Sequence, residues 1–271
     1  MILPRLREDT EGTIEKFLSE KLRKTGAKGF VIGVSGGIDS AVVLRLCVKA
    51  VGAKKVLAVM MPEKESPPED LADAIELCEH DGVRHRTVDI TEAVASFKKA
   101  VGPVDRTALA NIKARCRMIV LYQFANSEKM LVAGTSNKSE MLMGYFTKFG
   151  DGAADLEPIG DIYKTEVREL GNQLAIPAKI LKKAPSAGLW KGQTDEGEMG
   201  ITYDRLDAIL LGLELGLKEK EVAERADTTV KEVERISNII RMTSHKRKYQ
   251  PVAKIGFRTP GLDWREGDED L

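Results

Sequence analysis

Apolar residues along this chain follow two spacings that alternate from the N-terminal region to about residue 175. Short runs rich in β-branched residues predict buried strands, and apolar positions three and four residues apart predict amphipathic helices. In residues 107–126 this spacing places Ala108, Ile112, Cys116 and Ile119 on the buried face. The predicted strands are 29–34, 55–60, 84–89 and 129–133, with a short fifth at 156–159. The predicted helices are 10–24, 41–51, 66–81, 91–100, 107–126, one beginning at Asn137, and 163–172.

This alternation predicts an α/β fold, an open parallel sheet with helices on both faces. We expect about five strands and assume the order 3-2-1-4-5. Ligands of such sheets bind beyond the carboxyl ends of the strands, where the strand order reverses. With the assumed order, the turns that follow the first and fourth strands would face each other across one crevice.

The pattern changes after Pro185. Residues 186–200 contain four glycines and little periodicity, which predicts a mobile loop. A loop of this length is usually functional, so we expect it to act as a lid. Residues 201–271 predict a helical C-terminal part, with helices at 203–213, 217–226 and 229–242. We therefore expect one domain over 1–271, with residues 26–185 as its α/β nucleotide-binding core.

Residues 35–40, Ser-Gly-Gly-Ile-Asp-Ser, form the turn between the first strand and its helix. Two glycines permit a sharp turn and leave N–H groups unshielded, and such groups at a helix N-terminus bind anions. A carboxylate beside a phosphate site indicates a cation between them, so Asp39 is a candidate Mg²⁺ ligand. The turn lacks the lysine of the common phosphate loop. It resembles the pyrophosphate-binding loop of ATP pyrophosphatases, and a helix-capping turn is the simpler alternative.

A second polar turn, residues 134–140, also follows a strand and opens a helix, so it is a second candidate for binding phosphate oxygens. Glu140 is either a capping-box glutamate or a second carboxylate on the same Mg²⁺. The loop from Tyr145 to Asp155 mixes aromatic, cationic and acidic residues without periodicity. This composition suits a polar organic ligand better than a core.

Composition limits the classes of function. Lys+Arg and Asp+Glu both number 42, which argues against a nucleic-acid partner because such proteins usually carry a basic face. The three cysteines lack the spacing of a zinc or redox site. Neither a signal peptide nor a bilayer-spanning apolar run is visible in the sequence. We therefore expect a cytoplasmic protein without a membrane partner.

The chain resembles the ammonia-dependent NAD synthetases over nearly its whole length and in family order. The first matching stretch is typical of the whole ATP pyrophosphatase superfamily, whereas the later stretches are specific to a much narrower group of proteins. The resemblance implies an adenine-nucleotide alpha-hydrolase-like fold and a ligase that makes NAD from deamido-NAD, ATP and ammonia. It implies that ATP first adenylates the nicotinate carboxylate and that ammonia then displaces AMP. The matching stretches are residues 33–40, 111–118, 134–140, 144–151, 156–164, 185–196 and 245–247.

The resemblance also implies residue roles. Mg²⁺ would be held by Asp39 and Glu140, and Asp39, Lys164 and Ser35 would be catalytic. Without the resemblance, Lys164 and Arg115 would be interpreted as exposed helix charges. The implied ATP-binding residues are Gly33, Val34, Ser35, Gly36, Gly37, Ile38, Asp39, Ser40, Thr135, Lys164 and Ser186. The implied deamido-NAD contacts are Arg115, Lys148, Asp155, His245 and Lys246.

The resemblance also bears on two kinds of partner, a second copy of the chain and the source of nitrogen. Members of the family form homodimers whose dinucleotide site is completed at the subunit interface, so the resemblance places the helix that carries Arg115 there. The chain has no room for a glutaminase domain, which makes free ammonia the expected nitrogen donor and leaves a separate glutaminase partner possible.

Two other functions are compatible with parts of the pattern. One is another adenylating enzyme, such as a GMP synthetase synthase subunit or a tRNA thiolase, although a thiolase should show paired reactive cysteines. The other is a non-catalytic ATP-binding module. Such a module would need neither two metal-binding carboxylates nor a long lid.

Overall fold

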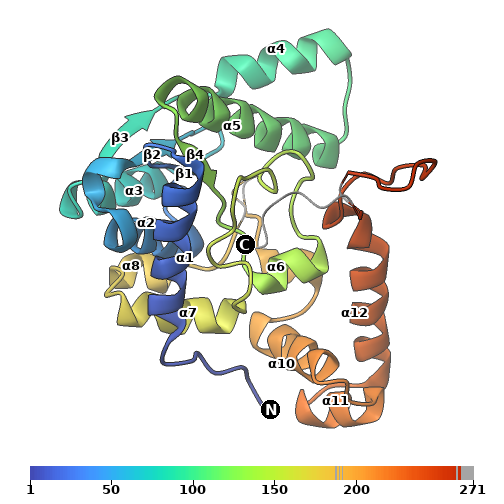
Figure 1. The fold of residues 1–271 in the computed structure, drawn as a ribbon. Coiled ribbons are helices and arrows are strands. Elements are labelled where there is room, and N and C mark those ends of the chain that lie inside the picture. The colour runs from blue at the N-terminus through green and yellow to red at the C-terminus, as the bar shows by residue number, and fades with distance from the viewer. Residues whose placement is uncertain (187, 189, 191, 261, 264–271) are drawn as a thin grey trace.

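The computed structural model describes residues 1–186, 188, 190, 192–260 and 262–263. Within this part, the sheet consists of four parallel strands in the order β3-β2-β1-β4 (Figure 1), which confirms the α/β class and the order of the first four strands. The inner strands β1 and β2 are buried, which explains their continuous apolar sequences. The strands are β1 (Phe30–Gly33), β2 (Val56–Met60), β3 (Arg84–Thr87) and β4 (Leu131–Ala133).

The prediction of a fifth strand at residues 156–159 is wrong. Leu156 lies beside β4, where that strand was expected, but it makes only an isolated parallel bridge with Ala133. Pro158 has no backbone N–H and cannot donate to a ladder, so the pairing stops there. The sheet therefore ends at β4 and this single bridge.

Every helix predicted from the sequence is present, and the short helices α8 and α9 were not predicted. Helix α9 lies within the predicted lid, of which residues 187, 189 and 191 fall outside the described part. The helices are α1 (Thr10–Thr25), α2 (Ile38–Val51), α3 (Pro68–His80), α4 (Thr91–Val101), α5 (Arg106–Glu128), α6 (Lys138–Met143), α7 (Lys164–Gln173), α8 (Ala178–Leu181), α9 (Asp195–Met199), α10 (Tyr203–Glu214), α11 (Glu219–Arg225) and α12 (Val230–Met242), with 3₁₀ turns at η1 (Ala53–Lys55) and η2 (Thr243–Lys246).

The helices cover both faces of the sheet. Helices α1, α2, α3 and α7 pack on one face in the largest hydrophobic core, and α5 covers the other face. A further core joins α6, α10, α11 and α12, and Figure 1 shows α10–α12 grouped away from the sheet. The boundaries 26–185, 186–200 and 201–271 stay a prediction.

One residue that was predicted on the buried face of α5 is exposed in the structure. Ile119 is 53% exposed, whereas Ala110 and Ala114 are buried. Ile119 lies one helical turn after Arg115, which is also exposed, so these two residues share the outer side of α5. In the described part of the chain, no helix is long and apolar enough to cross a membrane.

Candidate active site

The carboxyl ends of β1 and β4 open onto a cleft of about 300 Å³. The turn that follows β1 and the turn that follows β4 both line it, as expected from the observed strand order. All the predicted ATP-binding residues except Gly36 line this cleft, and so does Glu140. The fold thus brings together side chains that lie more than 120 positions apart in sequence, such as Asp39 and Lys164.

The turn after β1 is held open by its own serines. The Ser40 hydroxyl accepts a hydrogen bond from the Ser35 N–H at 3.2 Å and donates to the Gly37 carbonyl at 3.0 Å. Gly36 has a φ of +80°, and a Cβ there would lie 2.3 Å from the Asp70 carbonyl oxygen. Only glycine suits this position, because the backbone is left-handed and another backbone lies against it.

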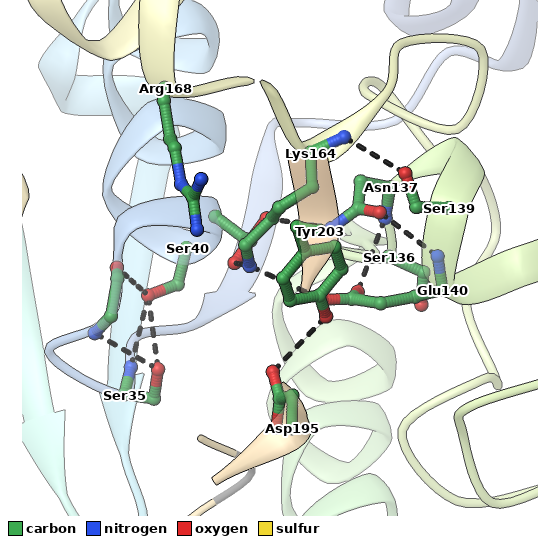
Figure 2. A network of polar contacts seen from close by, with 12 residues as sticks. Ser35, Ser40, Ser136, Asn137, Ser139, Glu140, Lys164, Arg168, Asp195 and Tyr203 are labelled. Atoms are coloured by element: carbon green, nitrogen blue, oxygen red, sulfur yellow. Dashed lines mark hydrogen bonds and ion pairs between the residues drawn. The ribbon is translucent and has the colours of Figure 1, made fainter. Parts of the chain in front are cut away.

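A buried lysine joins the two turns. Lys164 is the first residue of α7 and is 1% exposed. Its ammonium forms ion pairs with Asp39 and, at 3.3 Å, with Glu140. The Asn137 amide donates to the other Asp39 oxygen at 2.9 Å. Figure 2 shows Lys164, Asn137 and Glu140 converging from α7 and α6, so Lys164 is not the exposed helix charge that its sequence context alone suggests.

The two carboxylates share one cation, the ammonium of Lys164. Burial raises the pKa of Glu140 to about 8, although the neighbouring Lys164 charge opposes the shift. Burial also lowers the pKa of Lys164, but the charges of Asp39 and Glu140 outweigh it, and the net shift is upward. Lys164 is therefore fully charged at neutral pH, and Glu140 exchanges its proton near neutrality.

Glu140 has the capping role considered from the sequence, and its role as a Mg²⁺ ligand stays a prediction. Asn137 caps α6 by accepting from the Glu140 N–H at 3.0 Å, and the Glu140 carboxylate accepts from the Asn137 N–H, so a capping box is present. The same carboxylate reaches Lys164 with its other oxygen. A capping role therefore orients Glu140 toward the cleft rather than away from it.

Two residues that the sequence did not single out complete this network. The Tyr203 hydroxyl lies 3.3 Å from Glu140 Oε1 and 3.2 Å from Asp195 Oδ2, as Figure 2 shows. Asp195 is 4% exposed, and among the described residues its Oδ1 has no hydrogen-bond partner. Both residues begin helices, and their local sequence context indicates no role in the site. Asp195 lies within the matching stretch 185–196, but the resemblance gave it no role.

A third residue missed from the sequence fixes the helix that carries Lys164. Asp207, fully buried on α10, accepts from the Thr165 N–H at 2.8 Å and from the Ser139 hydroxyl. The Ser139 oxygen in turn accepts from the Lys164 N–H at 3.0 Å. The first N–H groups of α7 are thus capped by side chains from α10 and α6. These contacts fix where α7 begins and therefore where Lys164 lies.

The turn after β4 rests on Glu157. Its carboxylate accepts from the Ser136 N–H at 3.1 Å, and a Cβ on Gly134 would lie 2.3 Å from it. Burial raises the pKa of Glu157 to about 8. At neutral pH this side chain therefore holds a proton beneath the turn that carries Thr135.

Replacing Glu157 with glutamine should make the protein more stable in alkali. The Glu157 pKa is raised from about 4.5, so its contribution to stability is complete below pH 4.5 and is lost as the pH rises through 8. Glutamine keeps the acceptor for the Ser136 N–H and does not titrate. We expect a Tm gain of roughly 2–5 °C at pH 9 and almost none at pH 5. Thermal melts across this range test it, with the exposed Glu79→Gln as control, and equal shifts at both pH values would contradict it.

The predicted deamido-NAD contacts fall into two places. Arg115 donates to the Lys148 carbonyl at 3.2 Å, and the Lys148 ammonium donates to the His245 carbonyl at 2.7 Å. Lys246 binds the Gly144 and Phe146 carbonyls, each at 2.7 Å. The side chains of Arg115, Lys148 and Lys246, with the His245 backbone, therefore gather beside residues 144–148, and none of these four residues lines the cleft.

Asp155 lies apart from that cluster. One of its oxygens accepts from the Val132 N–H at 2.7 Å, and the other from the Tyr122 hydroxyl at 3.3 Å. The side chain thus occupies the free edge of β4, where a fifth strand would have bonded. In this structure Asp155 completes the sheet edge and is not brought together with the four others.

Comparisons with known proteins agree with this geometry. The sequence model of the NAD synthase family matches residues 11–250. The NH(3)-dependent NAD(+) synthetase of Thermococcus kodakarensis is 47% identical over 238 residues, which are 87% of this chain and 93% of that protein. An NMN synthetase structure from Francisella tularensis has a TM-score of 0.82 and 38% identity, covering 92% of this chain and 98% of its own.

A second solved structure is similar over the same length. The NH3-dependent NAD synthetase from Campylobacter jejuni, in complex with the nitrate ion, has a TM-score of 0.78 and 30% identity, and the match covers 91% of this chain and 98% of that one. The family match spans both turns of the cleft and the lysine between them. By its sequence, its fold and this cleft, the chain belongs to the NAD synthase family.

Proposed function

We propose that this protein catalyses the ATP-dependent amidation of deamido-NAD with ammonia, giving NAD, AMP and pyrophosphate. The observation that supports it most is the Lys164 ammonium held between Asp39 and Glu140 beside the glycine turn. The nicotinate carboxylate would attack the α-phosphate of ATP and release pyrophosphate. Ammonia would then attack the carbonyl of the mixed anhydride and release AMP. Buried donors and cations offset the charge that develops on the phosphates.

Magnesium fits this site. Carboxylate oxygens are preferred Mg²⁺ ligands, and nucleotide enzymes usually supply one or two while phosphates and water complete the octahedron. Among the described residues, no group of three or more His, Cys, Asp or Glu could hold a metal ion alone. Asp39 and Glu140 would therefore hold Mg²⁺ together with the nucleotide. The metal would neutralise phosphate charge, while Lys164 and Asn137 keep the two carboxylates oriented.

Deamido-NAD would bind beside residues 144–148, where three cationic side chains lie close together. Arg115, Lys148 and Lys246 gather there through contacts with backbone carbonyls. Their positive charges suit the pyrophosphate of deamido-NAD. The predicted lid over residues 186–200 would exclude water from the adenylate. A cytoplasmic location stays a prediction.

A homodimer through α4 and α5 would complete this site. Three large apolar side chains on these helices are exposed: Phe97 at 47%, Val101 at 61% and Ile119 at 53%. Arg115 lies one helical turn from Ile119 on α5, so a partner that covers Ile119 would also lie beside Arg115. Interfaces between copies commonly bury such apolar residues.

Replacing Ile119 with aspartate should therefore convert the dimer to a monomer. The added charge would be desolvated at the interface, a cost large enough to weaken association by several orders of magnitude. Light scattering should show the mass fall by half, and the KM for deamido-NAD should rise while ATP binding is kept. Leu215→Asp is the control, because Leu215 is a similarly exposed apolar residue that directly follows α10. A dimer that survives Ile119→Asp would contradict this interface.

The function itself is tested by following pyrophosphate and NAD with Mg·ATP and deamido-NAD, with ammonium or glutamine as nitrogen source. NAD formation with ammonium is the expected result. Since one similar structure is named an NMN synthetase, nicotinate mononucleotide should be run as the competing acceptor. Turnover with xanthosine monophosphate alone would indicate a GMP synthetase subunit. ATP binding without any turnover would indicate a binding module.

A further inference from the structure

Lys183, which no motif singled out, joins three segments that are distant in sequence. Its ammonium donates to the Gly36 carbonyl at 3.1 Å, to Asp70 Oδ1 at 2.7 Å and to Asp73 Oδ2 at 2.9 Å. An ammonium has three N–H donors, so these contacts use all of them. Lys183 therefore links the glycine turn, the first turns of α3 and the segment that leads into residues 186–200.

The contact with Gly36 fixes the orientation of one peptide group. In a trans peptide the C=O of one residue and the N–H of the next point in opposite directions. With the Gly36 C=O directed at Lys183, the Gly37 N–H is directed away from it, and Gly37 lines the cleft. This N–H donates to the Ser35 hydroxyl at 3.2 Å. Lys183 thus orients a donor that an incoming phosphate can use.

Lys183 also controls the charge of the cleft wall. Asp70 lines the cleft beside the glycine turn, and its negative charge would repel a triphosphate. Lys183 neutralises it at 2.7 Å, and both side chains are only 27% exposed. Asp73 is held by a second cation, Lys179, at 2.7 Å, whereas no Lys179 contact with the glycine turn is found in the described part.

We propose that Lys183 is a positioning residue for ATP: it orients the Gly36–Gly37 peptide and neutralises Asp70, and it does not bind the phosphates itself. This inference rests on the proposed function only in taking ATP as the ligand. It concerns the binding of Mg·ATP and not the acceptor or the nitrogen source.

Calorimetric titration of Mg·ATP into the full-length protein tests the proposal. Lys183→Met should weaken ATP binding about tenfold or more, as expected for loss of a charge-assisted hydrogen bond and exposure of an unpaired carboxylate. The KM for ATP should rise while the KM for deamido-NAD changes less than about twofold. Lys179→Met is the matched control, because it removes a cation from the same acidic cluster without touching the turn. Its ATP affinity should stay within about twofold of the original.

The double variant Asp70→Asn/Lys183→Met separates positioning from direct phosphate binding. It removes the repelling charge, so it should recover at least about threefold of the affinity lost in Lys183→Met. It also guards against misfolding of the single variant, since no unpaired carboxylate remains at position 70.

Three outcomes would overturn the inference: unchanged ATP affinity in Lys183→Met, an equal loss in Lys179→Met, or no recovery in the double variant, which would make Lys183 a phosphate ligand. If the unsubstituted protein binds Mg·ATP but makes no NAD, the proposed reaction fails and this inference is decided by the same titrations. If the unsubstituted protein binds no Mg·ATP, both fail.

Discussion

Replacing Asp39 with alanine should reduce NAD formation by at least about 10²–10³-fold, the loss typical when a group that stabilises transition-state charge is removed. Asp39 is the only described carboxylate that contacts both the Lys164 ammonium and the side-chain amide of Asn137. Without it, the proposed Mg²⁺ site would lose one of its two carboxylates, and Lys164 would lose its nearer partner. The fold should survive, because Lys164 keeps its ion pair with Glu140.

Pyrophosphate release at increasing Mg²⁺ measures this effect. The variant should need more Mg²⁺ for whatever activity remains, and its thermal melt should stay close to that of the original protein. Glu69→Ala, which removes an exposed acid from the first turn of α3, is the control for losing one carboxylate near a helix start. Near-normal turnover in Asp39→Ala would rule out the metal role.

Replacing Lys164 with methionine should remove activity and also destabilise the fold by about 3–5 kcal/mol at pH 8, the cost of leaving buried charge unpaired. Lys164 is the shared cation of Asp39 and Glu140, and both carboxylates are largely shielded from water. Without it, the pKa of Glu140, already raised to about 8 by burial, would rise further. The destabilisation should therefore shrink as the pH falls and Glu140 takes up a proton.

Denaturant unfolding at pH 6 and pH 8 tests this pattern. Lys138→Met is the matched control: Lys138 begins α6 as Lys164 begins α7, but its partners Glu214 and Asp161 are far more exposed. That substitution should cost less than about 1 kcal/mol at either pH. A cost for Lys164→Met that is the same at both pH values, or as small as the control, would contradict the shared-cation account.

The sequence predicted which residues form much of the site, but it did not predict how they are arranged in space. The two phosphate-type turns and the candidate carboxylates could be found locally, because a glycine-rich turn between a strand and a helix leaves a chemical signature within six residues. The role of Lys164 came only from the resemblance to a family. In its own sequence context it is a helix charge, and it becomes buried because Asp207 and Ser139 cap α7 from two other helices.

The alternation of strands and helices and the glycine turns could be predicted from the chain alone, because the spacing of apolar residues and local turn chemistry are properties of short segments. The family was predicted from a resemblance that extends over nearly the whole chain. Only the folded chain shows that β4 does lie beside β1, as assumed, that Ile119 is exposed, and that the pairing at residues 156–159 stops after one bridge, before Pro158. It also shows that Asp195 lines the cleft and that the Tyr203 hydroxyl lies between Asp195 and Glu140. Such results depend on which distant surfaces pack together, and no periodicity within one segment encodes them.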